Sequence, residues 1–101
     1  MKESRLVRTG SNDDRELPGE DLIEAGLRDL ELGVESVEAL LVSIGAPRLR
    51  ELGLPVASPF PEPELRLYER LRGDDPDGAH SAYNALVRRL VSFERAAERA
   101  S

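Results

Sequence analysis

Apolar side chains recur every three or four residues along most of the chain after residue 17, which is the spacing of a helix that buries one face. Glycine and proline interrupt this spacing and so mark the ends of separate helices. The expected helices cover residues 20–32, 37–44, 46–52, 62–72 and 79–100. No segment shows the alternating β-branched pattern of a strand. The sequence therefore predicts an all-α fold, a small antiparallel helical bundle of four main helices plus the short helix 46–52.

A few residues set the predicted helix ends. Ser36 is a candidate N-cap for the second helix, and Gly33 and Gly45 are expected to end the first and second helices. Residues 54–63 carry four prolines, which exclude a regular helix and favour an extended connector. Phe60 is expected to pin this connector to the core, because burying an aromatic ring stabilises a protein by about 1.5–3 kcal/mol.

The first 17 residues differ from the rest of the chain. They mix charges with glycine, serine and asparagine and lack a sustained apolar period, so residues 1–17 are expected to form a flexible N-terminal tail. A chain of 101 residues is long enough for one hydrophobic core but not for two. Residues 18–101 are therefore expected to form a single helical domain.

Composition narrows the classes of function. The absence of cysteine excludes disulfides, a thiolate nucleophile and cysteine-based metal sites. No stretch approaches the roughly 20 apolar residues of a membrane helix, and the N-terminus lacks the apolar region of a secretory signal. We therefore expect a cytoplasmic protein that does not enter a membrane. The net charge is −6, and residues 1–45 account for it with 5 basic against 11 acidic side chains, whereas residues 79–101 carry 4 basic against 2 acidic.

Candidate catalytic chemistry is sparse. His80 is the single histidine, so a histidine-pair metal site or a catalytic triad must use it alone. Asp74, Asp75 and Asp77 resemble part of a calcium loop, but the carboxylates at its first and last positions are missing. Nucleotide-binding and nucleophile motifs are also absent. We expect a protein that is not an enzyme and has no cofactor or metal, and a metal-dependent or His80-assisted hydrolase is the third hypothesis for its function.

The second hypothesis is a nucleic-acid-binding regulator. The two predicted helices on either side of Gly45 form a helix, a tight turn and a helix, with Arg48 and Arg50 near the start of the second one. Such an arrangement can place a helix in a DNA groove. The second helix is short, however, and carries Glu51 but none of the amide side chains that read base edges. A structural helix hairpin is the favoured interpretation.

The last predicted helix carries two stripes. Arg88, Arg95 and Arg99 lie on one face at i, i+7 and i+11, where they suit phosphates or an acidic protein surface. The favoured acidic surface is the first predicted helix, in this chain or in a twofold-related copy. An apolar stripe from Ala79 to Ala97 follows a nearly heptad spacing and suits lengthwise packing against another helix, in this chain or in a second subunit. The leading hypothesis is therefore a non-enzymatic protein-interaction or regulatory module that forms a homodimer and binds a protein partner through the three arginines.

Overall fold

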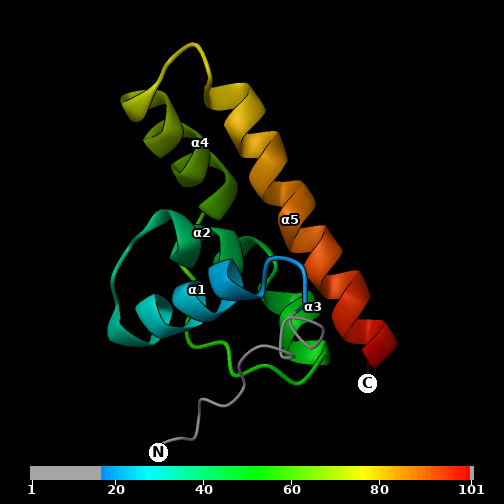
Figure 1. The fold of residues 1–101 in the computed structure, drawn as a ribbon. Helices are drawn as coiled ribbons and strands as arrows, with labels where there is room; N and C mark the ends of the chain where they lie inside the picture. The colour runs from blue at the N-terminus through cyan, green and yellow to red at the C-terminus, as the bar shows by residue number, and fades with distance from the viewer. Residues whose placement is uncertain (1–16, 101) are drawn as a thin grey trace, which may run out of the picture.

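The computed structural model describes residues 17–100, and these residues form helices with no strand among them (Figure 1). The helices are α1 (Glu20–Leu32), α2 (Val37–Ile44), α3 (Ala46–Glu51), α4 (Pro63–Asp74) and α5 (Ala79–Ala100). The predicted all-α fold is confirmed. The predicted flexible tail covers residues 1–17. Residues 1–16 lie outside the described residues, and Leu17 packs against the core.

Local capping chemistry explains the boundaries between α1 and α2. Gly33 adopts φ 75°, the left-handed conformation that ends α1, and this conformation favours glycine because it has no Cβ. The Ser36 hydroxyl accepts a hydrogen bond from the Ala39 N–H at 3.0 Å and donates one to Asp29 Oδ2 at 2.7 Å. The predicted N-cap is therefore confirmed, and its hydroxyl also ties the start of α2 to α1.

Helix α4 ends slightly later than the sequence indicated. The prediction ended this helix at residue 72 with Gly73 as its stop, whereas α4 continues through Gly73 to Asp74. A glycine in a helix costs only about 1 kcal/mol relative to alanine, so it does not by itself stop a helix. Pro76 restricts the backbone of Asp75, which adopts an extended conformation at the C-cap. The proline, not the glycine, accounts for the observed end.

The hydrophobic core is built around α2. Leu40, Leu41 and Val42 are fully buried, and α2 contacts each of the other four helices. Helix α1 lies across α2 in Figure 1, and the two helices approach each other closely at Gly26, where an added Cβ would clash with the Glu38 backbone carbonyl and with Val42. This central position explains why α2, the most apolar segment, has no exposed face.

Helices α4 and α5 form a hairpin that packs beside α2 (Figure 1). Leu67 is the buried residue of α4, and Tyr68 stacks edge-on against Tyr83 of α5 with ring centroids 6.0 Å apart. Further along α5, Leu90 and Phe93 join the core cluster. The apolar stripe of α5 is thus covered largely within the chain, so the stripe alone does not require a second subunit.

The proline-rich connector between α3 and α4 is fastened to the core by two contacts. The Phe60 N–H donates a hydrogen bond to the buried Ser43 hydroxyl at 3.0 Å, and that hydroxyl donates to the Ala39 carbonyl at 2.8 Å. The Phe60 ring packs against the core cluster. The expectation that Phe60 pins the connector is therefore confirmed, and the Ser43 hydroxyl provides a second anchor.

Within residues 17–100, no helix has both the length and the apolar content needed to cross a membrane.

Candidate functional site

Arg48, one of the two arginines of the nucleic-acid hypothesis, joins α3 to α5. Its Nη2 lies 2.7 Å from Glu98 Oε1, and its Nη1 lies 3.2 Å from Glu51 Oε1. The hydrogen bond to Glu98, followed by that to Glu51, raises the pKa of Arg48 above its ordinary value. The guanidinium is therefore already engaged by two carboxylates of its own chain.

Arg50 has a structural partner of a different kind. Its Nε and Nη2 both donate to the Val56 carbonyl, at 3.3 and 3.1 Å, and Nη2 also donates to the Ala57 carbonyl at 3.1 Å. The planar guanidinium suits this fork of backbone acceptors and holds the connector against α3. Because Arg48 and Arg50 both make contacts within the chain, nothing in residues 17–100 favours the nucleic-acid hypothesis, which stays untested.

The three arginines of the leading hypothesis lie together on the outer face of α5. Arg88, Arg95 and Arg99 are exposed, and none of them forms an ion pair with another residue of the described part of the chain. Arg89 follows Arg88 in the sequence but lies about 100° further around the helix, and its guanidinium pairs with Asp21 of α1 at 3.5 Å. The acidic first helix therefore meets α5 through Arg89 and leaves the predicted stripe of Arg88, Arg95 and Arg99 facing solvent.

The two glutamates of α5, which dilute its basic charge in the sequence, lie on a different side of the helix. With roughly 100° per residue, Glu94 and Glu98 are displaced by roughly a quarter to a third of a turn from the arginine stripe. Glu98 pairs with Arg48, and Glu94 packs beside Gly45, where an added Cβ would lie 3.0 Å from its Oε2. Folding thus separates the acidic and basic side chains of α5 and leaves a face of one charge.

A hollow lies beside the first arginine of this stripe. It has a volume of about 420 Å³ and is bounded by Pro18 and Gly19 on one side and by Ala85, Arg88, Arg89 and Ser92 of α5 on the other. The small side chains of α5 keep the hollow open next to the guanidinium.

The hydrolase hypothesis gains no support from the geometry. His80 is exposed at the start of α5, and no hydrogen bond or ion pair joins it to another residue of 17–100. The turn aspartates are also exposed. The described residues contain no group of three or more histidine, aspartate or glutamate side chains that could hold a metal ion.

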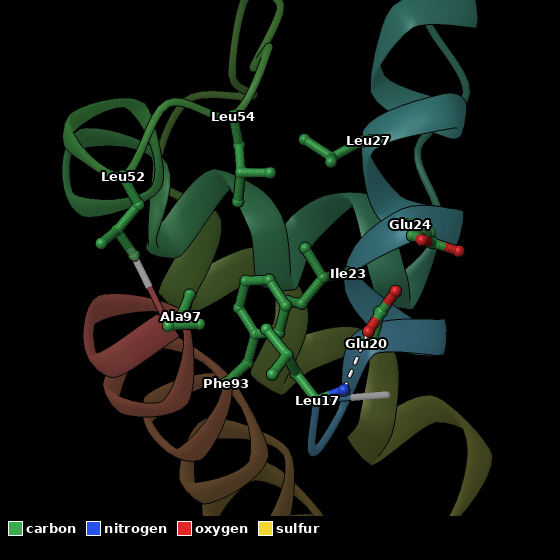
Figure 2. A pocket seen from close by; sticks show the side chains of 10 residues that line it. Leu17, Glu20, Ile23, Glu24, Leu27, Leu52, Leu54, Phe93 and Ala97 are labelled. Carbon is green, nitrogen blue, oxygen red and sulfur yellow. Dashed lines mark hydrogen bonds between the residues drawn. The ribbon is translucent and has the colours of Figure 1, made fainter. Parts of the chain in front are cut away.

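An apolar groove lies between α1, the start of the α3–α4 connector and the C-terminal part of α5 (Figure 2). The sequence did not indicate it. Its volume is about 430 Å³. Figure 2 shows the side chains arranged around one space, with Leu54 and Leu27 at one end and Leu17 and Phe93 at the other. Glu20 and Glu24 stand on the α1 wall, and Glu20 Oε1 accepts a hydrogen bond from the Leu17 N–H at 2.8 Å.

The groove could not be found from periodicity because its walls come from three separate segments. Leu27 and Phe93 lie on apolar helix faces whose ordinary interpretation is core packing. Leu54 follows the third helix in a segment with no period at all. The one further signal is Leu17, an apolar residue directly before Pro18 and Gly19, and it falls within the segment predicted to be a tail.

No family model, curated protein or solved structure matches this chain. The proposals below therefore depend on two features of the molecule, the stripe of Arg88, Arg95 and Arg99 and the apolar groove.

Glu94 gives this part of the molecule a pH dependence that can be measured. Burial raises the pKa of the Glu94 carboxyl, and the charge of Arg48 opposes that rise. A carboxyl whose pKa is higher in the folded than in the unfolded state binds its proton more tightly when folded, so its stabilising contribution is present below the unfolded pKa and is lost as pH rises through the folded pKa. We expect Glu94→Gln to remove the loss of folding stability that the Glu94 carboxyl causes as pH rises.

The measurement is urea unfolding of the parent and of Glu94→Gln between about pH 4 and about pH 7, the range that spans a raised carboxyl pKa. The variant is expected to gain stability relative to the parent as pH rises. The control is Glu69→Gln, which makes the same chemical change at an exposed position of α4. A difference between Glu94→Gln and the parent that does not vary with pH contradicts the prediction.

Proposed function

We propose that this protein is a non-enzymatic protein-interaction or regulatory module that binds an acidic protein surface through Arg88, Arg95 and Arg99. The observation that carries the proposal is the separation of charge on α5, where Glu98 and Glu94 lie toward α3 and the three arginines face solvent without ion pairs within residues 17–100. From Arg88 to Arg99 the stripe spans about 16 Å at 1.5 Å per residue, a length suited to contacting one helix or loop of a partner.

The use of arginine on a rigid helix supports this proposal. Guanidinium groups form bidentate hydrogen bonds with carboxylates, and a stripe of one charge steers an acidic partner and fixes its orientation. Arg48, Arg50, Arg66 and Arg89 make ion pairs or backbone hydrogen bonds within the chain. The stripe thus differs from the arginines that have a structural task.

Charge reversal on the stripe is expected to weaken partner binding strongly. The full chain is immobilised and used to capture its partner from the native host after nuclease treatment. With Arg88→Glu, Arg95→Glu and Arg99→Glu combined, the affinity for the partner is expected to fall at least about tenfold, equivalent to ~1.4 kcal/mol, and the amount of partner recovered falls with it. Binding by the parent is expected to weaken as salt increases, because exposed charges are screened.

A control with the same change in net charge separates a specific surface from a general charge effect. Arg28, Arg70 and Arg72 are exposed on α1 and α4, and their combined replacement by glutamate is expected to leave recovery close to that of the parent. Circular dichroism verifies that both variants keep their helices. Equal recovery with the stripe variant contradicts the proposal. Nucleic acid recovered in a parallel capture without nuclease, with the proteins lost after nuclease treatment, favours the second hypothesis and its Arg48 and Arg50 instead.

We further propose that the protein forms a homodimer, in which a second copy supplies the acidic surface that the arginine stripe binds when no other partner occupies it. Leu90 and Phe93 of the apolar stripe are buried within the chain, so this stripe does not support a dimer. The support is the difference in charge between the two halves of the sequence. Light scattering at tens of micromolar tests this, and a mass of one chain contradicts it. The antiparallel arrangement of four main helices and the cytoplasmic location also stay predictions.

A further inference from the structure

Leu17, Leu27 and Leu54 are only partly buried where they line the apolar groove, so an occupant covers apolar surface that otherwise meets water. Its volume of about 430 Å³ lies within the roughly 300–1,000 Å³ of pockets that hold small ligands or several side chains. Apart from Glu20 and Glu24, every lining side chain is apolar. Such a lining suits a short apolar segment with a basic residue beside it.

The chain itself contains such a segment. Residues 1–16 include Leu6 and Val7 as an adjacent apolar pair, with Arg5 directly before it and Arg8 directly after it. The apolar pair matches the walls of the groove, and the two arginines complement the carboxylates of Glu20 and Glu24 on the α1 wall.

The chain enters the described structure at the groove. Leu17 is a wall residue, so the segment before it is tethered at the edge of the groove. Val7 and Leu17 are ten positions apart in the chain, a separation of at most about 33–36 Å when extended, and a tether of this length gives an effective concentration of about a millimolar. Even a weak affinity is therefore sufficient for occupancy within one chain.

We propose that Leu6 and Val7 of the N-terminal segment occupy this groove in their own chain, with Arg5 and Arg8 beside Glu20 and Glu24. The groove is then a binding site for an apolar pair flanked by arginines, and the N-terminal segment is its built-in ligand. A partner that presents the same chemistry competes with the segment for the groove. This inference is independent of the function proposed for the arginine stripe on α5.

Methyl NMR of the full chain tests the proposal. The double variant Leu6→Asp, Val7→Asp is compared with the parent, and the substitutions lie outside residues 17–100 and so leave the core intact. We expect the methyl resonances of Ile23, Leu27 and Leu54 to shift, while those of Leu40 and Leu67, which lie in the core away from the groove, stay in place. The control variant Thr9→Asp, Ser11→Asp adds two carboxylates to the same segment and is expected to leave all five unchanged.

A synthetic peptide of residues 1–12 then serves as a probe of the emptied groove. Added to the double variant, it is expected to restore the parent positions of the groove methyl resonances, and its apparent affinity for the parent is expected to be several-fold lower because the parent's own segment competes. Absence of groove shifts in the double variant overturns the proposal. In a last experiment, unlabelled parent is added to the isotope-labelled double variant. If the groove methyl resonances of the variant then return to the parent positions, and the mass is that of two chains, occupancy within one chain is overturned. The groove then binds the segment of a second copy.

Discussion

Replacing Gly26 with alanine is expected to lower the free energy of unfolding by about 3 kcal/mol, the upper part of the usual range for overpacking a core. An added Cβ would clash with Val42 and with the carbonyl oxygen of Glu38, whose carbonyl carbon lies 2.9 Å from the Cβ position. A backbone group cannot rotate away, so α1 and α2 must separate. The clash outweighs the gain of about 1 kcal/mol that alanine normally brings to a helix. Urea denaturation followed by circular dichroism measures the difference.

Gly73→Ala is the matched control for this prediction. Gly73 also lies inside a helix, α4, but nothing lies within 4 Å of the position of its Cβ. Here the same substitution is expected to stabilise the protein by up to about 1 kcal/mol. Opposite signs for the two variants support the close approach of α1 and α2, whereas a stabilising effect of Gly26→Ala contradicts the described packing of these helices.

Leu67→Ala is expected to lower the free energy of unfolding by about 3–4 kcal/mol, within the range measured for cavity-forming leucine truncations. Leu67 is completely buried and is the single buried residue of α4, so its loss removes the main apolar contact of this helix with the core. Because domains of this size are stable by only about 5–15 kcal/mol, the α4–α5 hairpin is expected to loosen first. Amide hydrogen exchange along α4 records this loosening.

The control for Leu67→Ala is Leu65→Ala on the same helix. Leu65 is 53% exposed, so its truncation is expected to change the free energy of unfolding by less than about 0.5 kcal/mol, as is usual for surface positions. Similar losses for the two variants contradict the orientation of α4 described above.

Most of the helix boundaries were predictable because they depend on neighbouring residues. Ser36 caps α2 through the Ala39 N–H three residues later, and Gly33 ends α1 through its own backbone conformation. Gly73 was the exception, since a glycine is compatible with a helix interior and the stop comes from Pro76. Predictions of this kind succeed when one short-range interaction dominates, and they fail when two candidate signals lie close together.

The candidate sites were predictable only in part. Helical periodicity is sufficient to group Arg88, Arg95 and Arg99 on one face. It does not show that Glu98 pairs with Arg48, because that contact joins helices far apart in the sequence. For the same reason Arg50, which the sequence presents as a candidate for nucleic-acid binding, binds the carbonyls of the connector instead.

The sequence by itself determined the all-α class, five helical segments and the anchoring role of Phe60, since these follow from periodicity, capping and the burial of apolar area along the chain. The tertiary structure alone decided which arginines are engaged within the chain, that the apolar stripe of α5 is covered by its own core, and that Leu17, Leu54 and Phe93 meet in one groove. Ion pairs and grooves depend on the distance between residues that are remote in sequence, and only the packing of the helices fixes that distance.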